Sequence, residues 1–450
     1  MPDSRDLTAG PVRGHLARLG LPMVLGIVGV LSISLADAYF LGRLGTDELA
    51  AISYTFPVVL TLQSLGIGLS AGASSVASRA IGGGEKDEAK RLATDAIVLA
   101  VLLIAVLTAA GLLAVRPLFA ALGAEGAVLD AVVRYMRVWF FGLPFLVVPM
   151  VANGLIRANG DSVAPSAIMA FGALINVALD PVFIFGAGPV PALEVEGAAW
   201  ASLIARAVTF AAALGVLVFR ERLLTAAIPS ADALLASWAR VLSVGAPAAV
   251  STSVNPLAIT AVTAFLASFG DETVAAFGVA TRIESLASVP MLALSSAIGP
   301  VAGQNWGRGD VGRTVTAMRL SFWFCCGWAV VIAGAFWLTA PLVAGLFTND
   351  AGVAGRVATY LRITGLSLAG YGVVVTASAA FNATGRAFRG LGMTSLRSIG
   401  LYAPLAGLGV VLGDPVLAFA GIAAANVLSG GIVWAWAMRT TNEQTCPGAR

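Results

Sequence analysis

Charged residues are scarce in this 450-residue chain, at 11% of the total against about 25% in water-soluble domains. Cysteine and histidine are rarer still, with three and one in the whole chain. Two cysteines, Cys325 and Cys326, are adjacent in an apolar stretch, and the sequence has no CxxC motif. We therefore expect no disulfide framework and no redox or metal centre, and the composition excludes a water-soluble domain.

Motifs of common enzyme active sites are also missing. The sequence has no HExxH, no paired histidines, no GxSxG at a strand-to-helix turn and no P-loop GxxxxGK[ST]. We expect neither an enzyme nor a bound cofactor. Without a P-loop the chain has no site for ATP hydrolysis, so any transport it performs has to be driven by an ion gradient.

Apolar residues dominate the chain, at 58% of it with a mean hydropathy of +0.90. Stretches long enough to cross about 30 Å of hydrocarbon recur throughout, and each has to be a helix because a spanning backbone must satisfy its own hydrogen bonds. We predict an all-α polytopic membrane protein with twelve transmembrane helices. The predicted spans are 16–41, 49–78, 95–115, 132–156, 164–187, 197–219, 241–269, 274–303, 317–347, 357–382, 391–413 and 415–438.

Basic residues predict the orientation of these spans. When consecutive connections are assigned to alternate sides, one side collects 19 of the 27 basic residues, Arg397 among them, while Arg206 and Arg282 lie within spans. By the positive-inside rule this side is cytoplasmic, which predicts a multi-pass protein of the cell membrane with both termini inside. The net charge of +3 is then a signal of topology, and we expect no nucleic-acid partner.

The chain repeats itself internally. Segment 41–85 aligns with 266–310 without a gap, and the G-x-G-[ED] pattern after a long span recurs at the same offset. We predict two six-helix bundles, 1–220 and 241–450, joined by a cytoplasmic linker at 221–240. Because each repeat has an even number of spans, the bundles should be related by a pseudo-two-fold axis along the membrane normal, with substrate bound between them.

Two acids lie inside apolar runs: Asp37 in 19–41 and Asp180 in 164–187. An Asp at the centre of a membrane helix costs about 2.5–3.5 kcal/mol, so it is rarely left without a polar partner or a water-filled cavity. Asn176 precedes Asp180 by four residues and shares its helix face. Two buried acids in one half of the chain suggest ion coupling.

Several motifs together resemble a known family over nearly the whole chain, from about residue 14 to 438. They are Asp37-x-x-Phe40-Leu41-Gly42-Arg43-Leu44-Gly45, Asn153-Gly154-x-x-Arg157-Ala158-Asn159-Gly160-Asp161, Asn176-x-x-x-Asp180-Pro181 and Gly303-Gln304-Asn305-x-Gly307. This combination is similar to the multidrug and toxic compound extrusion (MATE) transporters, and most to the branch that includes the DNA-damage-inducible F proteins.

The resemblance implies a secondary antiporter that exchanges H⁺ or Na⁺ for amphipathic, often cationic organic compounds. It places ion coupling on Asp37, Asn176 and Asp180, which would also hold Na⁺ if sodium is the coupling ion. It further implies that the first helix bends when these acids are protonated, and Pro22 and Gly26 are the expected source of that flexibility.

The predicted substrate-binding residues are Asp37, Tyr39, Tyr135, Asn153, Met169, Asn176, Ser202 and Arg282. Structural alternatives stay open at this stage. Asp37 could bond to a nearby hydroxyl, Asp180 could cap a helix end, and aromatic or Met side chains in helices more often serve packing.

We expect small amphipathic molecules and the lipid bilayer as partners, and a monomer. A flippase for a lipid-linked oligosaccharide or other amphiphile of the same superfamily is the alternative function. It would favour a cavity lined by several cations, and few Arg or Lys lie in the spans. A membrane enzyme would need a catalytic cluster near one interface, which the sequence does not offer.

Overall fold

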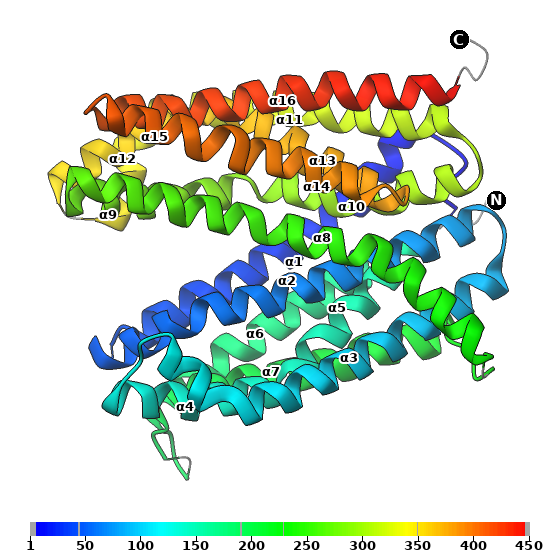
Figure 1. Cartoon of the computed structure of the whole chain (residues 1–450), viewed down its shortest axis with the longest axis horizontal. Coiled ribbons are helices and arrows are strands. Elements are labelled where there is room, and N and C mark those ends of the chain that lie inside the picture. Colours follow the sequence, from blue (N-terminus) through cyan, green and yellow to red (C-terminus); the bar gives the residue numbers. More distant parts are fainter. Residues whose placement is uncertain (1–5, 44–45, 190, 228, 349, 446–450) are drawn as a thin grey trace. The chain divides into compact units, whose positions relative to one another are not determined.

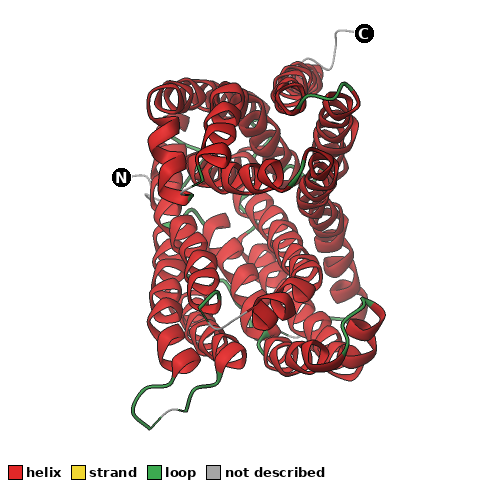
Figure 2. Ribbon diagram, turned by 90° about the vertical axis from the view of Figure 1, so that its left-hand side faces the viewer, coloured by secondary structure: helices red, strands yellow, loops and turns green. Residues whose placement is uncertain are grey.

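The computed structural model describes residues 6–43, 46–189, 191–227, 229–348 and 350–445. All its secondary-structure elements in these ranges are helices, as Figure 2 shows. Nine are long and apolar enough to cross a membrane, or eleven if each of two bent helix pairs counts as one span. The predicted all-α polytopic membrane class is confirmed.

The first half of the chain contains eight helices, seen in blue to green in Figure 1. They are α1 (Val12–Leu41), α2 (Thr46–Gly82), α3 (Lys86–Ala121), α4 (Gly126–Phe141), α5 (Leu143–Ala158), α6 (Val163–Phe185), α7 (Glu194–Gly215) and the π-helical turn η1 (Val216–Arg220).

The second half begins with α8 (Ala231–Leu266) and η2 (Ala267–Phe269). It continues with α9 (Asp271–Ala287), α10 (Val289–Gly307), α11 (Val311–Phe347), α12 (Ala351–Thr364), η3 (Gly365–Ser367), α13 (Leu368–Ala383), α14 (Ala387–Ser395), the π-helical η4 (Leu396–Tyr402), α15 (Ala403–Val411) and α16 (Pro415–Thr445). The predicted span 391–413 corresponds to α14, η4 and α15, in which a π-helical segment interrupts the α-helix.

The chain forms two compact units whose boundaries lie inside helices. The N-terminal unit is Pro22–Ala249, and the C-terminal unit combines Met1–Leu21 with Val250–Arg450. The sequence-based division instead set its boundaries at 220 and 241. In the structure the supposed linker is helical from Ala231 onward.

Close helix packing explains why the first part of α8 belongs to the N-terminal unit. A Cβ atom added to Gly72 of α2 would lie 2.3 Å from the carbonyl oxygen of Val241, and one on Gly68 would lie 2.4 Å from that of Gly245. Only glycine permits such an approach of two backbones, as at small-residue contacts between membrane helices. The connection to the second repeat therefore begins as part of the first unit.

The N-terminal segment is held by the C-terminal unit. Leu7 is fully buried, its N–H donates to Gln304 Oε1 at 3.2 Å, and its carbonyl accepts from Asn305 Nδ2 at 3.1 Å. Arg313 Nε donates to Asn305 Oδ1 at 2.8 Å and fixes that amide. Thus Gln304 and Asn305 of the Gly303-Gln304-Asn305 motif hold the N-terminal segment in place.

The repeat extends beyond the segments that the sequence aligned. Glycines with left-handed backbone occur in pairs at the same offset as those segments: Gly84 (φ +84°) and Gly309 (+85°), Gly160 (+86°) and Gly385 (+80°), and Gly188 (+60°) and Gly413 (+78°). Side chains other than glycine rarely adopt this conformation. The same connections therefore turn in the same way in both halves.

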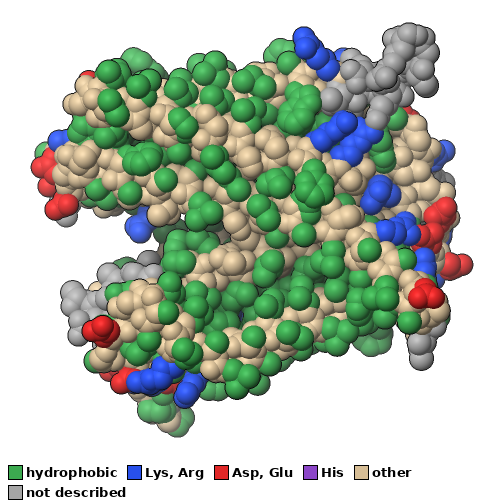
Figure 3. Space-filling model, viewed as in Figure 1, with side chains coloured by type: hydrophobic (Ala, Val, Ile, Leu, Met, Phe, Trp, Pro, Cys, Tyr) green, Lys and Arg blue, Asp and Glu red, His purple; other side chains and the backbone are tan. Residues whose placement is uncertain are grey.

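The surface fits a membrane environment. Figure 3 shows hydrophobic side chains along the lengths of the helices and most Lys, Arg, Asp and Glu near their ends. Leu113, Leu338 and Val411 are among the most exposed large hydrophobic residues, at 83–85%. Such exposure is unfavourable in water but expected where helices face lipid. The positions of the termini inside the cell and the pseudo-two-fold axis stay predictions.

Candidate functional site

Four helices of the N-terminal unit carry the predicted coupling site. Asp37 lies one turn before the end of α1, Asn176 and Asp180 lie on α6, Ser202 on α7 and Tyr135 on α4. Helices α6 and α7 pack closely along their lengths. Both Asn176 and Asp180 are buried.

The two acids lie near each other. Asp37 and Asp180 interact electrostatically, although they belong to helices far apart in the chain, and neither carboxyl oxygen of Asp180 has a hydrogen-bond partner among the described residues. Two nearby carboxylates repel each other, and a proton or a cation between them would relieve that repulsion. Asn176 Nδ2 donates to Ser202 Oγ at 3.1 Å, while Asn176 Oδ1 has no partner among the described residues. The oxygens of Asp37 and Asp180 and the unpartnered amide oxygen of Asn176 thus lie in the same region of the N-terminal unit.

Sequence reasoning missed one member of this cluster, Arg206. Its guanidinium interacts electrostatically with Asp37 and Tyr135 and lies 5.4 Å above the ring of Trp139. Arg206 follows Ser202 by one helical turn within an apolar span, and that spacing could have identified it. It supplies positive charge beside the acids and so offsets part of their negative charge.

The other predicted substrate residues are more scattered. Tyr39 is 60% exposed and packs against Phe40 and the guanidinium of Arg43. Asn153 is buried in α5, where its Oδ1 has no described partner, and Arg282 is exposed on α9 of the C-terminal unit. The structure therefore brings together Asp37, Tyr135, Asn176, Asp180 and Ser202, and none of these contacts involves Tyr39, Asn153 or Arg282 among the described residues.

The predicted flexible part of α1 is packed on α6. A Cβ atom on Gly26 would lie 3.2 Å from the Cα of Ser166 and 3.4 Å from the sulfur of Met169, and Gly29 approaches Ala170 equally closely. Gly26 thus serves close helix contact, and Met169 lies in that contact. Pro22 lies where the two compact units divide α1, one residue after Leu21.

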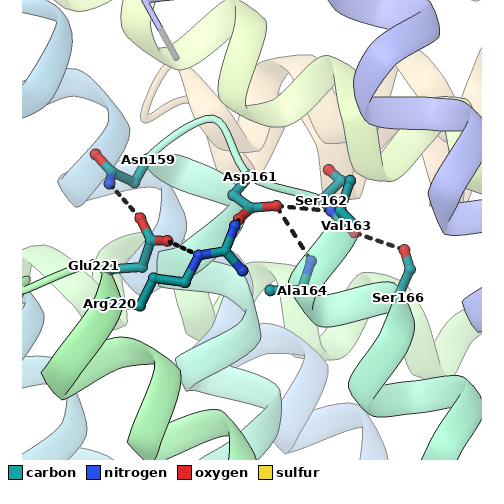
Figure 4. Close-up of polar contacts among 8 residues, drawn as sticks. All are labelled: Asn159, Asp161, Ser162, Val163, Ala164, Ser166, Arg220 and Glu221. Carbon is teal, nitrogen blue, oxygen red and sulfur yellow. Dashed lines mark hydrogen bonds and ion pairs between the residues drawn. The ribbon is translucent and has the colours of Figure 1, made fainter. Parts of the chain in front are cut away.

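A polar network ties the ends of α6 and α7 together (Figure 4). Asp161 Oδ1 accepts two backbone N–H groups at the start of α6, and its Oδ2 pairs with Arg220 at 2.8 Å. Asn159 donates to Glu221 Oε2 at 2.7 Å. These contacts, from the Arg157-Ala158-Asn159-Gly160-Asp161 motif, fix the two helices that carry Asn176, Asp180 and Ser202.

The C-terminal unit holds a second polar cluster. Arg397, counted with the basic residues of the predicted cytoplasmic side, is 6% exposed within η4. Glu284, two residues after Arg282 on α9, accepts a hydrogen bond from the hydroxyl of Tyr360 at 2.9 Å. No ion pair joins Glu284 to Arg282 among the described residues, since positions two apart on a helix do not face each other.

No group of three or more His, Cys, Asp or Glu side chains that could hold a metal ion is found among the described residues. If sodium is transported, the oxygens of Asp37, Asn176 and Asp180 would be its ligands. Hard cations prefer such oxygen donors.

The MatE family model matches residues 22–182 and 247–408. The FAD transporter of Shewanella oneidensis is 37% identical over 409 residues, which cover 91% of this chain and 90% of that protein. The multidrug export protein MepA of Staphylococcus aureus is 25% identical over 382 residues, 84% of this chain and 82% of MepA.

Solved structures of transporters superpose on the chain as well. A MATE transporter in complex with MaL6 has a TM-score of 0.92 and 27% identity, covering 99% of this chain and 100% of its own. The Vibrio cholerae MATE transporter VcmN in its bent form has a TM-score of 0.89 and 28% identity, covering 96% and 98%.

Proposed function

Because this chain belongs to the MatE family and is an efflux transporter rather than an enzyme, we propose that it exchanges H⁺ or Na⁺ for amphipathic organic compounds at the acid pair Asp37 and Asp180. The observation that supports this proposal is the proximity of Asp37 to Asp180, a buried acid whose two carboxyl oxygens have no hydrogen-bond partner among the described residues. They can hold either a coupling ion or a cationic substrate, but not both at once.

Exclusion between ion and substrate is what an antiporter requires. When a proton or Na⁺ occupies the pair, its negative charge is neutralised and a cationic substrate loses its counter-ion. When the ion leaves, the charge returns and the substrate can bind again. Asn176 and Ser202 keep the acceptor oxygens of the site in place through their hydrogen bond.

Bending of α1 would connect ion binding to substrate release. Pro22 lacks a backbone N–H and crowds the preceding turn, which weakens the helix at this residue. Asp37 lies farther along the same helix, so a change in its interaction with Asp180 would move the part of α1 that follows Pro22. Tight packing at Gly26 and Gly29 would have to slip during this movement.

Charge balance limits the driving force. Exchange of one proton for one monovalent cation moves no net charge, so the membrane potential, worth about 2.3 kcal/mol per charge per 100 mV, would add nothing. Two protons per cation would use it, and the presence of two acids permits that stoichiometry.

The substrate class has a second candidate, an anionic nucleotide such as FAD. Two observations favour it: the relative named an FAD transporter is 37% identical over 91% of this chain, and a buried Arg397 lies in the C-terminal unit. In this case the acid pair would hold only the ion. The flippase alternative, which also requires cations, is the function to test if neither class is transported.

The decisive experiment is efflux of ethidium from membrane vesicles under separately imposed pH and sodium gradients. We expect wild-type transport to follow one gradient and the Asp37→Asn protein to lose that dependence. Asp130→Asn, which changes an exposed acid of the same unit, is the matched control. Transport that depends on neither gradient, or that is unchanged in Asp37→Asn, would contradict the proposal.

A further inference from the structure

Arg397 is a buried cation in the C-terminal unit that the coupling scheme does not use. It belongs to the π-helical segment η4, between α14 and α15, inside a predicted membrane span. Its guanidinium lies between two aromatic rings, 4.7 Å from the centroid of Tyr371 and 5.2 Å from that of Tyr402. Arginine in such a position marks a functional site by default, because burying the charge is costly.

The direct partners of Arg397 are neutral. Its Nε donates to Asn426 Oδ1 at 2.9 Å, and its Nη1 donates to Asn255 Oδ1 at 2.7 Å. Asn426 is itself fixed, because its Nδ2 donates to Ser367 Oγ at 3.2 Å. Amide oxygens from α8 and α16 therefore orient the guanidinium, but they do not neutralise it.

No carboxylate of the described residues lies within ion-pair distance of Arg397. Glu284 acts on it only electrostatically, and the Glu284 carboxylate is engaged by Tyr360. A buried, oriented guanidinium without a direct ion-pair partner is an arrangement that can bind a phosphate or carboxylate, since its planar fork donates two parallel hydrogen bonds.

The backbone around Arg397 also departs from a regular helix. Single π-helical turns within α-helices are rare and occur frequently at functional sites. In the alignment that places 266–310 on 41–85, Asn426 falls on Ala201, next to Ser202, which bonds to Asn176 of the coupling site. The equivalent helix pairs of the two repeats therefore both present polar side chains, α6 with α7 in one unit and α14–α15 with α16 in the other.

Resting on the proposed export function, we propose that Arg397, together with Asn255 and Tyr371, binds the phosphate group of an anionic aromatic substrate. Tyr371 and Asn255, which border the guanidinium of Arg397, are both half-buried. Among the described residues nothing accepts a hydrogen bond from the second Nη of Arg397, which is therefore available for the phosphate. The ring of Tyr371 offers a surface for an aromatic group. The phosphate could belong to a nucleotide or to a lipid headgroup.

Binding of matched flavins to the purified protein tests this site. Riboflavin and FMN share their ring system, and only FMN carries a phosphate. From charge-assisted hydrogen bonding we expect wild-type protein to bind FMN about tenfold more tightly than riboflavin, as measured by flavin fluorescence quenching. The Arg397→Ala protein should lose this preference, and Arg397→Lys should keep part of it.

A second variant controls for the possibility that Arg397→Ala loses binding because it misfolds. Asn255→Asp places a carboxylate of the same shape on Nη1 of Arg397, so the cluster stays intact while its charge is neutralised inside the protein. We expect this variant to stay folded and to bind FMN and riboflavin equally. Arg116→Ala, at an exposed surface pair, is the control that should leave the FMN preference unchanged.

The lipid source is distinguished by comparing nanodiscs of phosphatidylcholine and phosphatidylglycerol, which both carry a phosphate but of which only phosphatidylglycerol has a net negative headgroup. If an anionic lipid headgroup occupies the site, phosphatidylglycerol should weaken FMN binding in wild type but not in Arg397→Ala. Equal affinity of wild type for FMN and riboflavin, or an unchanged FMN preference in both Arg397→Ala and Asn255→Asp, would overturn the proposal. The ethidium assay is independent of this outcome, because Asp37→Asn should retain the FMN preference.

Discussion

The two units bury charged side chains of opposite sign, and they do so in different surroundings. In the N-terminal unit two acids from different helices, Asp37 and Asp180, lie near each other, and Arg206 acts electrostatically on Asp37. In the C-terminal unit Arg397 is surrounded by amide oxygens and tyrosine rings, and its nearest acid, Glu284, is bonded to Tyr360. One cluster is built around two acids and the other around a guanidinium.

This difference is informative because the two clusters are carried by helices of the two repeats. Left-handed glycines at equivalent positions of the two repeats show that the connections follow the same course in both halves. The scaffold is therefore shared, while the chemistry depends on a few side chains placed on it. An exporter with this division can couple to an ion in one unit and recognise an anionic group in the other.

The largest effect is expected from a glycine that holds the C-terminal cluster together. A Cβ atom on Gly370 of α13 would lie 1.8 Å from the carbonyl oxygen of Asn426 on α16. Gly370→Ala should force these helices apart and cost about 3 kcal/mol or more of stability. Thermal unfolding in detergent measures this, and Gly431→Ala, where a Cβ atom meets nothing within 4 Å, should unfold like wild type.

The next test compares the acids of the two units directly. Asp180→Asn should reduce ion-driven efflux about 100-fold, because one carboxyl of the pair can then no longer exchange its ion. Glu284→Gln should change it less than about threefold, since that side chain keeps its bond to Tyr360 as an acceptor. Efflux rates under the effective gradient check both, and a larger loss in Glu284→Gln would reverse the roles assigned to the units.

A smaller loss of stability is expected from a substitution in the N-terminal segment, which belongs to the C-terminal unit. Leu7→Ala removes a fully buried side chain and should cost about 2 kcal/mol, reduced from the usual value by the mobility of a chain end. Faster proteolysis near the N-terminus and a lower melting temperature would be the signs. Leu113→Ala, at a position 85% exposed, should melt as wild type does in the same detergent.

The smallest effect is a dependence on pH at the same segment. Hydrogen bonds from the Thr8 hydroxyl and N–H lower the pKa of Asp6 below its usual 3.8, with a further contribution from Arg308. A lowered pKa in the folded state stabilises the segment above the unfolded pKa, and this contribution is lost as the pH falls through the lowered value. Protease sensitivity of the N-terminus should therefore be constant from pH 7 to about 5 and rise only below about pH 4. Asp6→Asn should abolish this rise.

Much of the architecture could be read from local patterns. Each of the twelve predicted spans coincides with one helix or with consecutive helices, because a run of apolar residues in a membrane has to be helical wherever the chain goes next. The two acids could also be identified from the sequence, since a charged residue within an apolar run is unusual. Tyr135 and Ser202 were assigned to the same site, and the structure places them beside it.

Other features depend on residues far apart in the sequence, and no local pattern contains them. Hydropathy placed Arg397 inside the predicted span 391–413, but it could not identify its partners Asn255 and Asn426, which lie on other helices. The contact of Leu7 with Gln304 and the unit boundaries inside α1 and α8 also depend on residues far apart in the sequence. Hydropathy and repeats by themselves determined the class, the spans and the candidate acids. Only the tertiary structure decided which side chains meet, because packing joins helices whose separation along the chain no sequence window spans.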